Sequence, residues 1–275
     1  MALAWKIDEG TEVKLKDYDP DHREKHVDHD SAQEMLTQVN NELSELQELL
    51  AAAQHHSMLI VLQGMDTSGK DGTIRHVFTS VNPQGCEVHS FKEPTQEEIL
   101  HDFLWRVHKA APARGMIGVF NRSHYEDVLV VRVHNLVAED VWSKRYKEIN
   151  HFEKLLTNSG TIVLKFFLHI SNDEQKQRLL AREQDRDKAW KLSTSDWAER
   201  KYWDDYQAAY EDVLSKCSTD EAPWYIVPAN HKWYRNLAIA QVVTDTMNKY
   251  KDEWRADLEA RGQKELDALK KMREG

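Results

Sequence analysis

Residues 58–70 read MLIVLQGMDTSGK, an apolar run that leads into a glycine-rich loop and a lysine. A short, continuous apolar run is typical of a strand buried inside a parallel sheet, and residues 64–70 match the pattern GxxxxGK. The next eight residues, DGTIRHVF, indicate a helix that begins at the loop. This order predicts a phosphate-binding loop, because backbone N–H groups and the positive end of the helix then face the same anion.

The sequence on both sides of this loop alternates between strand and helix patterns. We expect further strands at residues 86–91, 116–121, 161–170 and 224–229, with helices at 31–56, 171–186 and 232–250 among the segments around them. Thr95–Glu98 and Ser171–Glu174 have the spacing of capping boxes. The alternation predicts an α/β fold, with a parallel central sheet covered by helices on both faces.

We expect a single domain over residues 1–250, with the helix at 31–56 near its start and a lid at about 184–205. A helical extension should follow at residues 251–275, where leucines are spaced among mixed charges.

Composition narrows the class of function. The chain has 275 residues and a formal net charge of −10, so the strong positive field needed for nucleic-acid binding is absent. Two cysteines are too few for a disulfide framework. The apolar runs are too short to span a bilayer, and the first residues lack the apolar region of a signal peptide. We expect a cytoplasmic protein that binds neither membrane nor nucleic acid.

The loop departs from the common motif at one position. Asp71 follows Lys70, where the usual Ser or Thr would bind magnesium. Asp66 is therefore the candidate ligand inside the loop, because carboxylates suit a hard cation. The alternative is that Asp66 only stabilises the turn through backbone N–H groups.

A second cluster lies at residues 119–127, VFNRSHYED, at the carboxyl end of a predicted strand. Ligands of open α/β sheets bind at that edge, so Arg122 can reach phosphates held by the loop. The alternative is a structural ion pair of Arg122 with Glu126 or Asp127. Those two carboxylates can instead bind magnesium or position the acceptor.

Arg178 and Arg182 are four residues apart on a predicted helix and share one face. A polar, basic stretch follows them, which is the composition of a lid that closes cations over phosphates. The alternative is an ordinary helical pair of Glu174 with Arg178.

Longer segments resemble the second family of polyphosphate kinases, over about residues 10–250. They are GMDTSGKDG, SFKEPTQEE, HDFLWRVHKAAPARG, FNRSHYEDVLVVRV, HFEKLLTNSGTIVLKFFLHIS, EQKQRLLAR and APWYIVPANHKWYRN. The resemblance implies a three-layer α/β/α P-loop kinase-like domain with a parallel central sheet and a helical lid, like that of thymidylate kinase. It implies phosphoryl transfer between inorganic polyphosphate and a nucleotide. It also implies magnesium, with manganese as a possible substitute, and a homodimer or homotetramer.

The resemblance also implies roles for individual residues. The catalytic residues are Asp66, Lys70 and Arg122. The phosphate-binding residues are Gly64, Ser68, Gly69, Lys70, Asp71, Gly72, Arg75, Arg122, Arg178 and Arg182. The nucleotide-binding residues are Lys92, Asn121, Glu126 and Asp127, and the metal ligands are Asp66 and Asn121.

One position separates this chain from many relatives. They have Asp-Arg-Ser-Trp-Tyr-Asn-Arg where residues 121–127 read NRSHYED, so Asn121 replaces an aspartate and coordinates metal more weakly, through its carbonyl. This variant resembles the class III subgroup, which phosphorylates nucleoside monophosphates and diphosphates. The expected reaction is therefore AMP to ADP and ADP to ATP from polyphosphate, and it is reversible. The alternatives are an ATP-dependent nucleoside monophosphate or small-molecule kinase of the same fold, or a non-catalytic nucleotide sensor.

Overall fold

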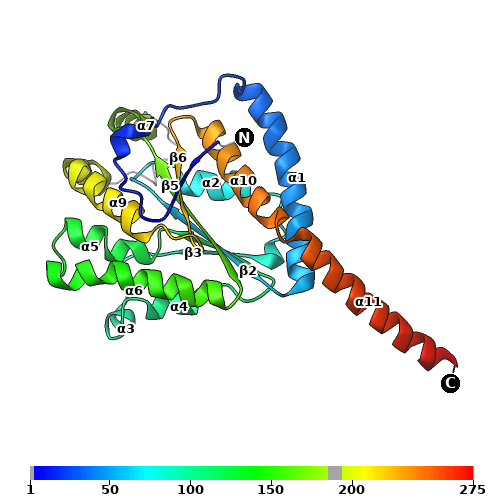
Figure 1. Ribbon diagram of the computed structural model, residues 1–275. Helices are drawn as coiled ribbons and strands as arrows, with labels where there is room; N and C mark the ends of the chain where they lie inside the picture. Colours follow the sequence, from blue (N-terminus) through cyan, green and yellow to red (C-terminus); the bar gives the residue numbers. More distant parts are fainter. Residues whose placement is uncertain (1–2, 185–193, 275) are drawn as a thin grey trace.

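A six-stranded sheet forms the centre of the computed structural model, which describes residues 3–184 and 194–274 (Figure 1). Its strand order is β1-β6-β5-β2-β4-β3. The strands are β1 (Trp5–Ile7), β2 (Ser57–Gln63), β3 (Cys86–Ser90), β4 (Ile117–Asn121), β5 (Thr161–His169) and β6 (Trp224–Pro228). Along the sheet, every neighbouring pair from β6 through β5, β2 and β4 to β3 is parallel, as expected. Strand β1, which was not expected, pairs antiparallel with β6 at the edge. Three residues are too few for a strand pattern to stand out in a sequence.

Helices cover both faces of the sheet, which confirms the α/β fold (Figure 1). One layer holds α1 (His29–Ala53), α2 (Lys70–Val77) and α10 (Lys232–Asn248). The other holds α5 (Val130–Val133), α6 (Glu139–Asn158) and α9 (Trp203–Cys217). The remaining α-helices are α3 (Gln96–Ile99), α4 (Trp105–Lys109), α7 (Asn172–Gln184), α8 (Thr194–Glu199) and α11 (Lys251–Glu274). Short 3-10 turns are η1 (Leu15–Asp17), η2 (Pro83–Gly85), η3 (His124–Asp127) and η5 (Arg200–Tyr202).

The central position of β2 fixes where the site lies. All seven of its residues are buried, and it pairs with β4 on one side and β5 on the other. The carboxyl ends of these parallel strands therefore meet at one edge of the sheet, where the glycine-rich loop follows Gln63.

Helix boundaries follow the capping side chains. The helix expected at 31–56 begins at His29, because the Asp28 carboxylate accepts from the N–H of Ser31 and the Ser31 hydroxyl caps in return. It ends at Ala53, where Gln54 adopts a left-handed conformation with φ of 57°. The Thr95–Glu98 capping box is present.

The expected lid at 184–205 falls partly on residues 185–193, which lie outside the described residues. After them, α8 and η5 are followed by α9. We assigned no helix to residues 203–217 from sequence, although its buried residues recur at helical spacing: Ala209, Tyr210, Val213, Leu214 and Cys217.

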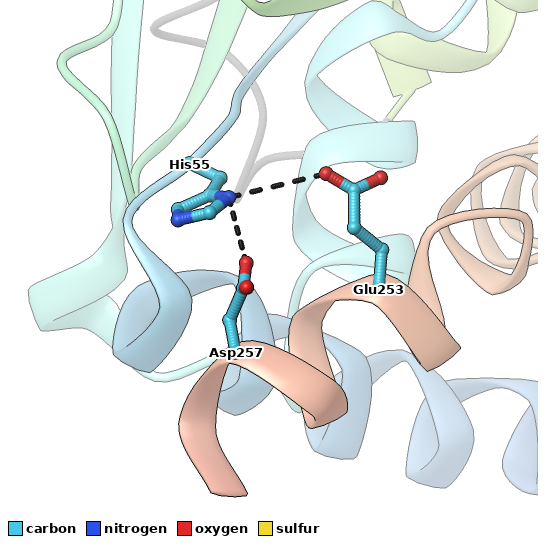
Figure 2. Close-up of side chains that lie close together, drawn as sticks. All are labelled: His55, Glu253 and Asp257. Atoms are coloured by element: carbon cyan, nitrogen blue, oxygen red, sulfur yellow. Dashed lines mark ion pairs between the residues drawn. The ribbon is translucent and has the colours of Figure 1, made fainter. Parts of the chain in front are cut away.

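Helix α11 leaves the body of the molecule after a short anchored root (Figure 1). Trp254 is fully buried and its Nε1 donates to Nδ1 of His56 at 3.1 Å. Beside it, Nδ1 of His55 lies 2.8 Å from Asp257 Oδ2 and 3.9 Å from Glu253 Oε1 (Figure 2). Residues 259–273 are all exposed.

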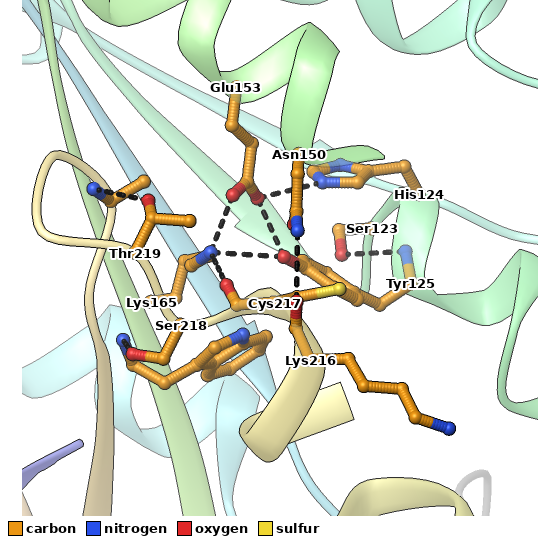
Figure 3. Close-up of polar contacts among 12 residues, drawn as sticks. Ser123, His124, Tyr125, Asn150, Glu153, Lys165, Lys216, Cys217, Ser218 and Thr219 are labelled. Carbon is orange, nitrogen blue, oxygen red and sulfur yellow. Dashed lines mark hydrogen bonds and ion pairs between the residues drawn. The ribbon is translucent and has the colours of Figure 1, made fainter. Parts of the chain in front are cut away.

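A buried polar cluster joins the strands to the second helical layer (Figure 3). Lys165 of β5 is fully buried, and its Nζ lies 2.5 Å from Glu153 Oε2 and 3.0 Å from the Tyr125 hydroxyl. Oε1 of the same glutamate accepts from Tyr125 and lies 3.1 Å from His124 Nε2. Burial opposes ionisation of Glu153, but Lys165 and His124 outweigh it and lower the pKa of the carboxyl. The cluster holds η3, which begins two residues after Arg122.

A search of the described residues found no helix with both the length and the apolar composition needed to cross a membrane.

We predict that Lys165→Ala destabilises the protein by about 3–5 kcal/mol, because it leaves the buried Glu153 carboxylate without its cation. Urea unfolding followed by circular dichroism measures the change. Lys216→Ala is the matched control. Its side chain is 49% exposed and pairs with Asp212 at 2.8 Å, so its loss should cost about 1 kcal/mol or less. Equal stability of the two variants would contradict this prediction.

Candidate active site

The glycine-rich loop runs from the carboxyl end of β2 to the start of α2. Gly64 has a φ of +152° and Gly69 a φ of +103°, and a Cβ on Gly64 would lie 2.8 Å from the backbone oxygen of Leu168. Glycine is therefore required at both ends of the curl. Because Gly69 has no side chain to cap α2, the first N–H groups of that helix are available to an anion.

Arg178 binds backbone carbonyl groups of the glycine-rich loop. Its Nη1 donates to the backbone oxygens of Thr67, at 2.9 Å, and Ser68, at 3.1 Å. The other donors reach Glu174 Oε1 and the backbone oxygens of Ala229 and Asn230. A guanidinium has five N–H groups, so these five contacts occupy all the hydrogen-bond donors of Arg178. The Glu174–Arg178 pair that the sequence left as an alternative is present, and here Arg178 braces the loop.

Arg235 supports the same loop and was missed from sequence. It is 2% exposed, its Nη1 donates to the oxygen of Ser68 at 3.0 Å, and its Nε and Nη2 donate to Asn236 Oδ1. A Cβ on Gly69 would collide with its guanidinium, which is a second reason for glycine there. An arginine placed just before the apolar run LAIA, at residues 237–240, was the signal that could have revealed it.

Lys70 folds back onto the loop. Its Nζ donates to the oxygens of Gly64, at 2.7 Å, and Met65, at 3.3 Å. Burial, followed by the charge of Arg122, lowers the pKa of this ammonium. An ammonium has three N–H donors, so Lys70 can serve phosphate oxygens with the third donor or by exchanging a carbonyl.

Arg122 faces the loop, as the sequence indicated. It follows β4 with a φ of +61°, a left-handed conformation that is uncommon outside glycine and concentrates at functional sites. Its Nη2 lies 2.9 Å from Asp66 Oδ1, so its partner is the loop aspartate, whereas the sequence left Glu126 or Asp127 as the alternative. The neighbouring Asn121 donates from Nδ2 to Asp71 Oδ1 at 2.8 Å.

A cavity of about 260 Å³ opens between these segments. Its lining includes Asp66 of the loop and, after β4, Arg122 and Glu126. Residues of α8 and of the first half of α9, including Tyr206 and Tyr210, also line it. The cavity thus joins the glycine-rich loop, the second cluster at residues 119–127 and the lid region, which lie far apart in the sequence.

Arg182 reaches the rim of this cavity through an ion pair. Its Nη1 lies 3.0 Å from Oδ2 of Asp196, a residue of α8 that lines the cavity. Burial, and then the nearby charge of Asp66, raises the pKa of Asp196. Sequence reasoning overlooked Asp196, because its role appears only when α8 packs against α7.

Oxygen donors suited to a divalent cation line the cavity. Asp66, Glu126 and Asp196 contribute carboxylates, and in the loop the buried hydroxyls of Thr67 and Ser68 have no hydrogen-bond partner among the described residues. This set fits a hard cation such as magnesium. Among the described residues, the three side chains whose potential metal-ligand atoms lie close together are His55, Glu253 and Asp257 (Figure 2). This group lies outside the cavity lining.

Of the residues predicted for the site, Gly64, Asp66, Arg122 and Glu126 line this cavity, and the others, Lys70 included, do not. Arg75 is exposed on α2, and Lys92 is exposed after β3, where its backbone oxygen accepts from Arg106. Asp127 is buried and lies 3.0 Å from Nη1 of Arg145. Burial raises the pKa of Asp127 although two arginines oppose the shift.

Comparison with known proteins identifies the family. The family model described as "Polyphosphate kinase 2 (PPK2)" matches residues 26–255. The chain belongs to the polyphosphate kinase 2 family. The match includes the loop, Arg122, both arginines of α7, and Arg235.

Named relatives extend over most of the chain. A Meiothermus ruber protein named "AMP/ADP-polyphosphate phosphotransferase" is 51% identical over 235 residues, covering 85% of this chain and 88% of its own. An "ADP-polyphosphate phosphotransferase" of Rhodopseudomonas palustris is 46% identical, covering 90% of each chain. Among solved structures, polyphosphate kinase 2 from Arthrobacter aurescens matches with a TM-score of 0.85 and 44% identity, over 88% of this chain and 87% of that one.

We predict that Gly69→Ala weakens polyphosphate binding at least about tenfold, or about 1.4 kcal/mol, because a methyl group displaces Arg235 and strains the backbone. Isothermal titration calorimetry measures the affinity. The control is Gly262→Ala in exposed α11, where a Cβ meets open space and should stabilise the helix by about 0.5–1 kcal/mol. An unchanged affinity in Gly69→Ala would remove the argument for the braced loop.

Proposed function

We propose that this protein transfers a phosphoryl group from inorganic polyphosphate to AMP and ADP, forming ADP and ATP reversibly. The observation that carries the proposal is the cavity in which the glycine-rich loop, Arg122 and the Arg182–Asp196 pair converge. The printed names of the relatives from Meiothermus ruber and Rhodopseudomonas palustris support the same substrates.

In this proposal the protein neutralises and aligns phosphates. The N–H groups of the loop and α2 bind oxygens of the terminal donor phosphates, and Lys70 exchanges a loop carbonyl for phosphate. Arg122 leaves Asp66 to meet the transferred group, which suits a planar guanidinium. Because the acceptor oxygen of AMP or ADP is already anionic at neutral pH, no general base is assigned.

Magnesium, or manganese in its place, fits the carboxylates around the loop. Asp66 would be the main ligand, and the carbonyl of Asn121 is available to it, since the amide nitrogen already donates to Asp71. When bound, the cation offsets charge on donor and acceptor phosphates.

The acceptor nucleotide belongs in the part of the cavity lined by Glu126 and by the aromatic rings of Tyr206 and Tyr210. The ion pair of Asp127 with Arg145 holds the segment that carries Glu126. Lys92, which does not line the cavity, stays a predicted nucleotide contact. We further propose a homodimer or homotetramer that acts in the cytoplasm.

A donor–acceptor matrix tests the activity. Purified protein with magnesium is offered polyphosphate or ATP as donor, and AMP, ADP or another nucleotide as acceptor. ADP and ATP should form from polyphosphate. Product from ATP alone would favour the ATP-dependent kinase, and nucleotide binding without turnover would favour the sensor.

We predict that Lys70→Ala and Arg122→Ala each lower kcat by at least about a hundredfold, because each removes a cation facing the transferred phosphate. Coupled luciferase detection of ATP measures the rate. Lys264→Ala, on exposed α11, is the control for a lost lysine and should retain the parent rate. A variant with near-parent kcat would remove that residue from the mechanism.

Arg178 and Arg182 should respond differently to substitution. Arg178→Ala leaves buried loop carbonyls unpaired and should lower the free energy of unfolding by about 3 kcal/mol or more. Arg182→Ala loses one partly exposed ion pair, so stability should change by about 1 kcal/mol or less while the KM for polyphosphate rises. Urea unfolding and steady-state kinetics separate the effects, and the reverse pattern would contradict these roles.

A further inference from the structure

Three potential metal ligands meet where α11 joins the body of the molecule (Figure 2). His55 lies in the turn between α1 and β2, whereas Glu253 and Asp257 lie near the start of α11. The two carboxylates are four residues apart, so they share one face of the helix. Both point toward Nδ1 of His55, which lies 3.9 Å from Glu253 Oε1 and 2.8 Å from Asp257 Oδ2.

The separations of these atoms fit a single metal ion. Zinc binds imidazole nitrogen and carboxylate oxygen at about 2.0–2.2 Å, so two ligand atoms of a tetrahedral site lie about 3.4 Å apart. The two distances from His55 Nδ1 fall on either side of that value, and all three ligand atoms lie within 4.8 Å of one another. Small rotations of the side chains therefore suffice to close the group around a cation.

One of the ligand atoms is buried without a hydrogen bond. Asp257 Oδ2 has no hydrogen-bond partner among the described residues, although His55 Nδ1 lies close to it. A buried carboxylate oxygen is costly unless a donor or a cation faces it. In neutral imidazole one ring nitrogen carries a lone pair, and a metal ion binds the lone pairs of the nitrogen and the oxygen together.

Neighbouring contacts hold the two segments that carry these ligands. Trp254 of α11 is fully buried, and its Nε1 donates to Nδ1 of His56 at 3.1 Å. Further along the same helix, Nη2 of Arg261 donates to the backbone oxygen of Ala52, near the end of α1. The ligands are therefore brought together by the fold itself, which lowers the ordering cost of binding an ion.

We propose that His55, Glu253 and Asp257 bind a divalent transition-metal ion, with zinc as the best match, that fastens α11 to the turn after α1. The imidazole disfavours magnesium and calcium, which prefer oxygen ligands, and suits zinc, which takes both nitrogen and oxygen. Water completes the coordination. The site is independent of the proposed activity, because the group lies outside the cavity lining and Asp257 lies beyond residue 255, where the family match ends.

Isothermal titration calorimetry of the metal-free, untagged full chain with zinc chloride tests the site, without polyphosphate or nucleotide present. His55→Ala removes the nitrogen ligand and should weaken zinc binding at this site at least about tenfold. The His55 side chain is 47% exposed, so the fold should remain, and circular dichroism checks this. Glu253→Gln removes one oxygen ligand and should also weaken binding.

Two substitutions serve as matched controls. His151→Ala removes an exposed histidine of α6, and Glu259→Gln removes an exposed carboxylate of α11, so both should bind zinc as the parent does. Magnesium at about a hundredfold excess should not displace zinc, and displacement overturns the choice of a transition metal. An absence of zinc binding by the parent, or equal binding by the parent and His55→Ala, overturns the site.

Hydrogen–deuterium exchange tests whether the ion fastens the helix. Saturating zinc should slow exchange of the backbone amides of residues 251–261 at least about tenfold in the parent, because each opening of this segment must first release the ion. The same addition should leave exchange unchanged in His55→Ala. Unchanged exchange in the parent, or equal slowing in His55→Ala, overturns the fastening role.

Discussion

The candidate site depends on how the carbonyls of the glycine-rich loop are held. A peptide group that points its oxygen one way points its N–H the other way, so binding the oxygens of Thr67 and Ser68 orients the adjacent N–H groups. Arg178 and Arg235, from two helices far apart in sequence, meet at Ser68 and fix this orientation before substrate arrives. Such preorganisation reduces the rearrangement needed when phosphate charge enters the site.

The rest of the fold positions this loop among its neighbours. The glycine-rich loop follows central β2 and Arg122 follows β4, and the parallel pairing of these strands brings both to one edge. The buried contacts of Lys165 with Glu153 and Tyr125 hold the segment after Arg122 against β5 and α6 (Figure 3). The left-handed backbone of Arg122 is thus supported on both sides, and its guanidinium is aimed at Asp66.

Sequence alone predicted the features that local patterns encode. The apolar run of β2, the alternation of strands and helices, and the facing of Arg122 and the loop all follow from short-range spacing and parallel topology. The short strand β1 left no pattern, and the brace formed by Arg235 depends on a contact between residues 68 and 235. Arg178 shows the limit most clearly, because helical spacing reveals which side chains share a face but not whether carbonyls or phosphates meet them.

The cations of the cavity already have anionic partners within the protein. Arg122 is matched by Asp66, and Arg182 by Asp196. A small isolated anion gains little by breaking one such match, since it exchanges one contact for another. A chain of linked phosphates can replace several partners at once, and each replacement after the first occurs within an already bound molecule. If polyphosphate binds in this cavity as proposed, the resting ion pairs favour long polyanions over free phosphate.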